Sequence, residues 1–324
     1  MVSIAVLHQG TEDMAKITIK KALGDHVSLP NIYDYDSLKI ASSSKSKIVV
    51  KDEDGNQIVF QGDNLELHGK NFAGGTVEKV QFIDEDKDQV AIVQGKFALK
   101  DLSPTDIIDN FMIFAKGNDT IKGSAKGDIL IYGTNAGNDT IKGLGGNDFI
   151  QGSGGANKID GGAGRRDVLS FSWLESSMET HIKGIKVDLD AGKIVNAWGK
   201  TDKVSGIEDV RGTHLNDKFV GSDANEYFRG MRGNDTFTGG GGRDVFEFAL
   251  YHGSDVITDF DPEDDKILFG QVGVLDTYAE LQSYMSESGD SVIINFGSGN
   301  KIEIRHTALE DLDAGNFRFV QVFE

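Results

Sequence analysis

The sequence predicts an all-β protein whose central part is a parallel β-solenoid. Two stretches, 115–169 and 207–265, repeat with a period close to nine residues, and each repeat combines a glycine-rich turn with one apolar position. The 324 residues include 41 glycines, 3 prolines and no cysteine, so neither a disulfide framework nor a zinc-thiolate site is expected. Acidic residues number 52 against 33 basic ones. The formal charge of −19 disfavours nucleic acid and anionic membranes as main partners.

Residues 1–101 lack the period and predict a small antiparallel β-domain. Alternating runs such as KIVVK (47–51) and QIVFQ (57–61) predict strands, and the segment between them carries an Asp-Gly hairpin signal. The first residues lack the basic region and cleavage site of a signal peptide, and no apolar stretch is long enough for a membrane span. The sequence assigns this domain no function.

A capping helix is expected at 102–114, between this domain and the repeats. Ser103 is a good N-cap, Pro104 suits the first helical position, and Ile107, Ile108 and Phe111 share one face. A helix here would cover the open end of the solenoid, which would otherwise invite edge-to-edge aggregation.

Each repeat places a polar residue, nearly always acidic, two positions before an apolar one. In the first stretch these residues are Asp119, Asp128, Asp139, Asp148, Asn157 and Asp167. In the second stretch they are Glu208, Asp217, Glu226, Asp235, Asp244 and Asp255. Glycine permits the tight turn, and the short strand that follows buries one side chain, such as Ile150 or Phe237. Two units form one coil, and stacked coils bury what a single unit cannot.

The stacked acidic positions predict metal sites. Carboxylates on one edge would lie roughly 5 Å apart and repel one another unless a cation lay between them. A ligand set of carboxylate and carbonyl oxygens favours calcium over zinc and magnesium. We therefore expect several Ca²⁺ ions at these positions and at Asp259. The turn glycines expected to contribute are Gly117, Gly127, Gly137, Gly143, Gly145, Gly152, Gly154, Gly161, Gly233, Gly239 and Gly241.

The segments GLGGNDFIQ (143–151) and GGGGRDVFE (239–247) resemble the RTX nonapeptide of hemolysin-type calcium-binding proteins. That pattern is Gly-Gly-x-Gly-x-Asp-x-apolar-x. The resemblance implies a right-handed parallel β-roll with calcium in its turns. Residues 266–324 resemble the cap and the C-terminal signal of type I secretion substrates. The resemblance therefore also implies a secreted or extracellular protein, with cell-surface association as a further option.

Differences between the repeats predict which calcium sites bind most strongly. The Asp pairs 119/139, 128/148, 148/167, 217/235 and 235/255 predict the best ones. The neutral Asn157 predicts a weaker site with Asp139, and the longer Glu226 predicts a distorted or empty site with Asp244. At the end of the second stretch, Asp255, Asp259, Asp261 and Asp265 either hold a last ion or form an acidic loop.

Residues 170–206 interrupt the period and predict a hairpin inserted into one continuous solenoid. Residues 185–189 alternate as a strand, and 193–197 read as the return strand. Trp173 and Trp198 either stack on a sugar or cover the flank of the solenoid, and covering is the better interpretation.

The sequence offers no catalytic residues that stand out from the acidic background. It lacks His-Glu-x-x-His, Gly-x-Ser-x-Gly and phosphate-loop motifs. The enzyme question stays open, leaning against. We expect a secreted protein that folds on calcium outside the cell and acts in adhesion or in a polysaccharide matrix. Its expected partners are the type I secretion machinery and extracellular polysaccharide. The alternative is a lyase, epimerase or hydrolase of acidic polysaccharide with the roll as carrier.

Overall fold

The computed structural model describes residues 16–19, 37–69, 71–87, 89–99, 117–130, 137–174, 182–249, 251–270, 275 and 277–320. The helix expected at 102–114 lies outside these residues. The chain divides into two compact units, Met1–Lys122 with Asn135–Thr140, and Gly123–Thr134 with Ile141–Glu324. In the part that is described, no helix is long and apolar enough to cross a membrane.

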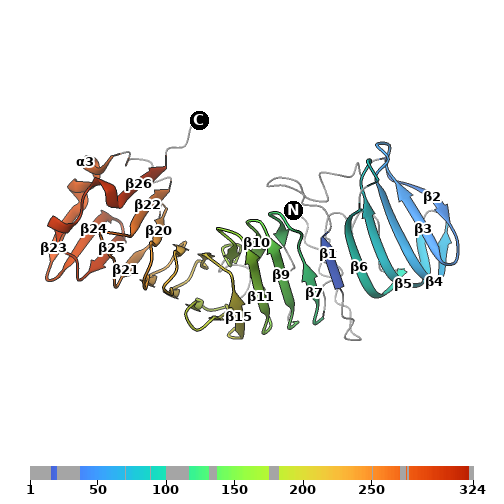
Figure 1. The fold of residues 1–324 in the computed structure, drawn as a ribbon, viewed down its shortest axis with the longest axis horizontal. Coiled ribbons are helices and arrows are strands. Elements are labelled where there is room, and N and C mark those ends of the chain that lie inside the picture. The colour runs from blue at the N-terminus through green and yellow to red at the C-terminus, as the bar shows by residue number, and fades with distance from the viewer. Residues whose placement is uncertain are drawn as a thin grey trace. The chain divides into compact units, whose positions relative to one another are not determined.

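The first unit contains an antiparallel meander, in which consecutive strands pair (Figure 1). Its strands are β2 (Lys39–Ser43), β3 (Lys47–Lys51), β4 (Gln57–His68), β5 (Asn71–Ile83) and β6 (Gln89–Ala98). Alternate residues such as Ile58 and Phe60 on β4, and Val80 and Phe82 on β5, are fully buried. The short strand β1 (Lys16–Ile19) joins this sheet to the first repeat strand, because it pairs with both β6 and β7 (Thr120–Lys122). The small antiparallel β-domain predicted from the sequence is confirmed.

The second unit is a roll with two sheets. One is an eight-stranded sheet in which every neighbouring pair is parallel. Its strands are, in order, β8 (Ile129–Leu130), β10 (Phe149–Gln151), β12 (Val168–Ser170), β16 (Asp209–Arg211), β18 (Tyr227–Arg229), β20 (Val245–Phe248), β22 (Lys266–Gly270) and β26 (Phe317–Val320). The chain alternates between this sheet and the opposite one, as a coil must.

The repeat strands of the opposite sheet pair in parallel, and antiparallel pairs occur at the inserted hairpin and in the C-terminal segment. Its strands are, in order, β9 (Thr140–Gly145), β11 (Lys158–Ala163), β15 (Thr201–Ser205), β14 (Lys193–Val195), β13 (Lys186–Asp188), β17 (Lys218–Val220), β19 (Thr236–Thr238), β21 (Ser254–Ile257) and β25 (Asn300–Arg305). The hairpin β13–β14 is antiparallel and lies between β15 and β17. The eight-stranded sheet continues without interruption from β12 to β16 and β18.

The core of the roll is the space between its two sheets. Each three-residue strand buries its middle side chain, as in β10 and β19. Early coils bury Leu130, Ile141, Ile150, Ile159 and Leu169, and later coils bury Phe219, Phe228, Phe237 and Phe246. The rings of Phe219 and Phe237 stack with centroids 4.9 Å apart. The all-β, parallel β-roll fold predicted from the sequence is confirmed.

The C-terminal segment closes the roll by extending both sheets. After α3 (Tyr278–Leu281) and η4 (Gln282–Tyr284), the strands β23 (Met285–Ser288), β24 (Ser291–Gly297) and β25 form an antiparallel meander. The turns η5 (Leu309–Asp311) and η6 (Ala314–Asn316) then lead into β26. Strand β25 pairs with β21, and β26 pairs with β22, so the last coil has a partner on each face. This is the predicted cap.

Candidate metal centre

A ladder of acidic side chains links successive coils at both edges of the roll. At each step, the backbone N–H of one acidic residue donates to a side-chain oxygen of the residue one coil later. Those bonds are 2.9 Å for Asp119 to Asp139, 2.8 Å for Asp128 to Asp148, 2.7 Å for Asp148 to Asp167, 2.8 Å for Asp217 to Asp235 and 2.8 Å for Asp235 to Asp255. The structure thus brings together all five Asp pairs that the spacing picked out.

The ladder also includes steps that the sequence reasoning missed or ranked low. Asp167 N–H donates to Glu208 Oε2 at 2.9 Å, and Asn157 N–H donates to Asp202 Oδ1 at 2.7 Å. Further on, Glu226 N–H donates to Asp244, and Asp244 N–H donates to Asp265. Asp202 lies in the inserted segment, outside the period. The signal that could have found it is the buried Val204 two residues later, which is the spacing of the repeat.

The ladder carboxylates are buried. Asp148, Asp235 and Asp244 are each 1% exposed. Burial raises the pKa of Asp148 to about 7 and that of Asp244 to about 8, and in both cases neighbouring carboxylates add to the effect. Burial, with the charges of the adjacent Asp217 and Asp255, raises the pKa of Asp235 to about 10. Ionised carboxylates in such surroundings are unfavourable unless a cation compensates them.

Several ladder residues have a second oxygen that is buried and unpaired. The oxygens are Asp148 Oδ2, Asp167 Oδ2, Glu226 Oε2 and Asp244 Oδ2. The space that Asp148 Oδ2 faces is lined by backbone, because a Cβ added to Gly143 would overlap both this oxygen and the carbonyl oxygen of Gly161. Carboxylate and carbonyl oxygens therefore converge on a space kept free of side chains. Calcium is the cation that prefers this kind of flexible, all-oxygen ligand set.

No group of three or more His, Cys, Asp or Glu side chains in the described ranges forms a metal cluster. A site in this roll would instead take two carboxylates from stacked turns and complete its shell with backbone carbonyls. The absence of a side-chain cluster is consistent with that arrangement.

The predicted glycines occupy positions of three kinds. At Gly127, Gly137, Gly161, Gly233 and Gly239, a Cβ would overlap atoms of a neighbouring turn or of a ladder side chain, as it would at Gly143. At Gly137 the added Cβ would overlap the carbonyl oxygen of Gly117, and at Gly152 it would overlap the ring of Phe171. Gly145 and Gly241 leave room, with nearest atoms at 3.4 Å. Gly154 offers its carbonyl as an acceptor.

Amide groups occupy the turn carbonyls of the coil that contains Asn157. Asn157 Nδ2 donates to the Gly154 carbonyl at 3.1 Å. Asn196 Nδ2, from the inserted hairpin, donates to the Gly155 carbonyl at 2.8 Å and to Asp202 Oδ2 at 3.1 Å. Sequence reasoning missed Asn196, because it lies outside the repeat. The weak site expected at Asp139 and Asn157 stays a prediction, and the turn after it is held by amide donors.

Protein donors also satisfy three other predicted ligands. Asp217 accepts from the Thr213 N–H at 2.7 Å and from the Thr213 hydroxyl. Asp255 contacts the buried His252 ring. Asp259 accepts from the backbone N–H groups of Gly239 and Gly240, at 2.8 and 2.9 Å. These contacts show that the ladder positions are not equivalent: some carboxylates have protein donors, and others keep an unpaired buried oxygen.

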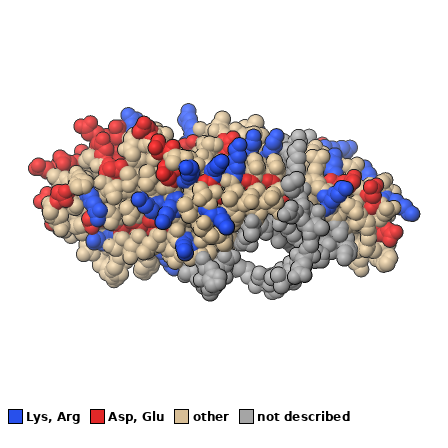
Figure 2. All heavy atoms as spheres, turned by 90° about the horizontal axis from the view of Figure 1, so that it is seen from below, with Lys and Arg blue, Asp and Glu red and all other residues tan. Residues whose placement is uncertain are grey.

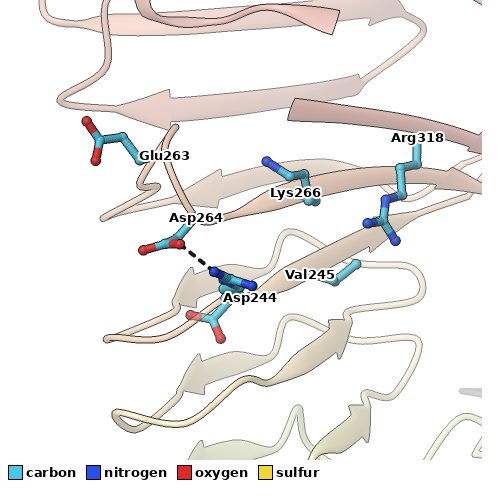
Figure 3. A pocket seen from close by; sticks show the side chains of 7 residues that line it. Asp244, Val245, Glu263, Asp264, Lys266 and Arg318 are labelled. Carbon is cyan, nitrogen blue, oxygen red and sulfur yellow. Dashed lines mark hydrogen bonds and ion pairs between the residues drawn. The ribbon is translucent and has the colours of Figure 1, made fainter. Parts of the chain in front are cut away.

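A polar hollow of about 330 Å³ lies beside the ladder at Asp244 (Figure 3). Its lining combines Arg243, Val245, Glu263, Asp264, Lys266 and Arg318 with Asp244. Arg243 and Asp264 form an ion pair of 3.3 Å within it. The walls carry both signs of charge.

The family model of the RTX calcium-binding nonapeptide repeat matches the chain in four copies, at residues 133–167 and 220–249. No curated protein matches the chain. Among solved structures, the crystal structure of the extracellular lipase LipA from Serratia marcescens matches with 18% identity and a TM-score of 0.31. That match covers 63% of this chain and 38% of the lipase chain. The matched repeats contain Asp148, Asp167 and Asp244, so the resemblance to RTX repeats is confirmed, and the cofactor is calcium, bound at several sites.

Proposed function

We propose that this RTX-repeat protein is secreted, that it stays unfolded where calcium is scarce, and that its roll folds when it meets calcium outside the cell. The observation that carries the proposal is the set of buried, unpaired oxygens at Asp148, Asp167, Glu226 and Asp244. A folded roll without cations would leave these groups uncompensated, at a cost of several kcal/mol in order of magnitude.

The mechanism couples folding to binding. The ladder residues hold each other in register through backbone N–H donors, and the second oxygens of Asp148, Asp167 and Asp244 lie beside the glycine that begins their own turn. When bound, calcium supplies the positive charge that these oxygens lack. Because the unfolded chain does not preform the site, calcium stabilises only the folded state, by mass action.

Secretion and location follow from the same coupling. RTX repeats are typical of type I secretion substrates, and a chain that stays unfolded in low calcium is suited to export through a narrow channel. Calcium near millimolar levels outside the cell matches the affinities expected of extracellular sites. We propose the type I machinery as one partner, and adhesion or a polysaccharide matrix, including association with the cell surface, as the setting in which the protein acts.

A calcium titration of the EDTA-treated chain tests this function. We expect the β-signal in circular dichroism to rise, and the hydrodynamic radius to fall, in a sigmoidal transition as calcium is added. Magnesium at the same concentration serves as control and should not replace calcium, since it demands a stricter octahedral shell. A metal-free chain with the same spectrum and the same radius as the calcium-loaded one would contradict the proposal.

A further inference from the structure

One face of the roll carries lysines on five adjacent strands. They are Lys158 on β11, Lys203 on β15, Lys193 on β14, Lys186 on β13 and Lys218 on β17, and all five are exposed. We call this set the lysine face. Figure 2 shows blue basic side chains close together on part of the face in view, with red acidic side chains among them. In a chain with a formal charge of −19, such a grouping of positive charge is unexpected.

Strand register places these lysines in two groups, because Lys193 on β14 lies opposite Asp188 on β13, and Lys186 lies opposite Val195. Lys158 is the partner of Lys203, Lys203 is also the partner of Lys193, and Lys186 is the partner of Lys218. Like charges directly opposite each other on adjacent strands are destabilising. The sheet thus keeps two groups of neighbouring positive charges that its own stability disfavours, and this points to a use outside the fold.

Among the described residues, the carboxylate of Asp188 lies opposite Lys193 on the adjacent strand, but it forms no ion pair with it. In the described part of the chain, none of the five lysines forms an ion pair with a carboxylate. The other outward side chains of the five strands include the carboxylates of Asp160 and Asp188. Asp160 accepts from the Ser205 hydroxyl, and Asp188 accepts from the Ala191 N–H. The lysine ammonium groups are therefore available to a ligand.

The spacing of the charges indicates what kind of ligand fits. Neighbouring strands lie about 4.8 Å apart, so the lysine face presents about one cation per strand along the axis of the roll. A linear polysaccharide of uronic acids carries one carboxylate on each sugar ring, and can lie along this axis with its charges in step. Double-stranded DNA carries one charge per roughly 1.7 Å of its axis. This charge density of DNA exceeds the density of lysines on the face, and the acidic remainder of the chain would repel the DNA.

We propose that the lysine face binds a linear, carboxylate-bearing polysaccharide. This inference rests on the proposed function, because the hairpin strands β13 and β14 reach the face only when the roll is folded. It adds to that function the class of ligand and the surface that recognises it.

The test compares two variants of equal charge. The face variant is K158Q/K193Q/K203Q, and the control variant is K39Q/K45Q/K301Q, whose lysines are not on the five strands of the lysine face. Each calcium-loaded protein is titrated with labelled oligogalacturonate too short to gel with calcium, with dextran, and with double-stranded DNA. We expect oligogalacturonate to bind the wild type, about tenfold weaker binding to the face variant, and a change of less than about twofold in the control.

The other outcomes overturn the inference. They are no binding of oligogalacturonate to the wild type, equal loss in both variants, or binding of dextran or DNA as tight as that of oligogalacturonate. A variant K186Q/K218Q gives an independent measurement if the triple variant does not fold. Circular dichroism with and without calcium separates the two proposals. Calcium-dependent folding without oligogalacturonate binding overturns this inference alone, whereas a roll that folds in EDTA overturns the proposed function.

Discussion

Asp148 belongs to two successive steps of the ladder, because it accepts from Asp128 N–H and donates its own N–H to Asp167. Its second oxygen is buried and unpaired. Replacing it in Asp148→Asn should weaken calcium binding in two turns. With calcium at roughly 100 times Kd, each lost site removes about 2.7 kcal/mol of stabilisation.

The measurement for Asp148→Asn is urea unfolding with and without calcium. The loss should appear only with calcium, because the asparagine oxygen can still accept the Asp128 N–H and the metal-free roll is expected to be unfolded. The matched control is Asp223→Asn, an exposed aspartate in a turn, which should leave the urea midpoint with calcium unchanged. Equal destabilisation of the Asp148 variant in EDTA would show that the residue has a structural role unrelated to metal.

Asn196 should behave in the opposite way. Its side-chain amide donates to the Gly155 carbonyl and to Asp202 Oδ2, and its oxygen accepts from Lys200 N–H. Asn196→Ala leaves buried acceptors and a donor without partners, and each such group costs about 1–3 kcal/mol. In a protein that still folds, the same unfolding experiment should show this loss at saturating calcium, and calcium should not restore it. Full recovery of stability with calcium would contradict the amide interpretation.

At the scale of the repeat unit, two predicted glycines of one turn have different surroundings. A Cβ on Gly143 would overlap Asp148 Oδ2 and the Gly161 carbonyl, whereas a Cβ on Gly145 would meet its nearest atom at 3.4 Å. Gly143→Ala should therefore destabilise the roll by about 1–3 kcal/mol through overpacking and should weaken calcium binding. Gly145→Ala is the control. Thermal melts at fixed calcium measure both, and similar melting temperatures would contradict the prediction.

The repeat units were predictable because each one carries its own signal. Turn glycines, the acidic position and the apolar residue two places later, such as Ile150 after Asp148, locate both the strand and the ladder. Such a pattern arises from local geometry alone. The sequence therefore predicts which residues face the core and which pairs meet at an edge.

The inserted segment shows where sequence reasoning ends. Its residues predict a hairpin, but local sequence does not say that β13 and β14 enter the sheet between β15 and β17, nor that Asp202 joins the ladder. These outcomes depend on which edges are left open by the coils on either side. Asn196 was missed for the same reason, since the carbonyls that it reaches, such as Gly155, lie 41 residues away.

At the scale of the whole roll, the two repeat stretches form one structure. Although the hairpin enters one sheet, the other passes directly from β12 to β16, with Leu169 paired to Val210. The acidic ladder also continues past the inserted segment, because the Asp167 N–H donates to Glu208. In a solenoid, the free energy of folding is a sum of terms for each repeat and for each pair of neighbouring repeats. The two stretches could therefore fold separately only if the contact between the coils that join them were weak. The roll has no weak interface at the insertion on this side.

The two stretches should therefore fold together. One calcium titration follows the fluorescence of Trp198, which lies in the inserted segment. A second follows a tryptophan at position 227, made by Tyr227→Trp in a Trp173→Phe, Trp198→Phe background. Both titrations should give the same midpoint. A matched variant, Asp167→Asn, removes the negative charge just before the crossing, keeps an oxygen that can accept the Asp148 N–H, and should move both midpoints to higher calcium. If each stretch instead responded at its own calcium concentration, and the Asp167 substitution moved only one midpoint, the roll would consist of two independent calcium-binding modules.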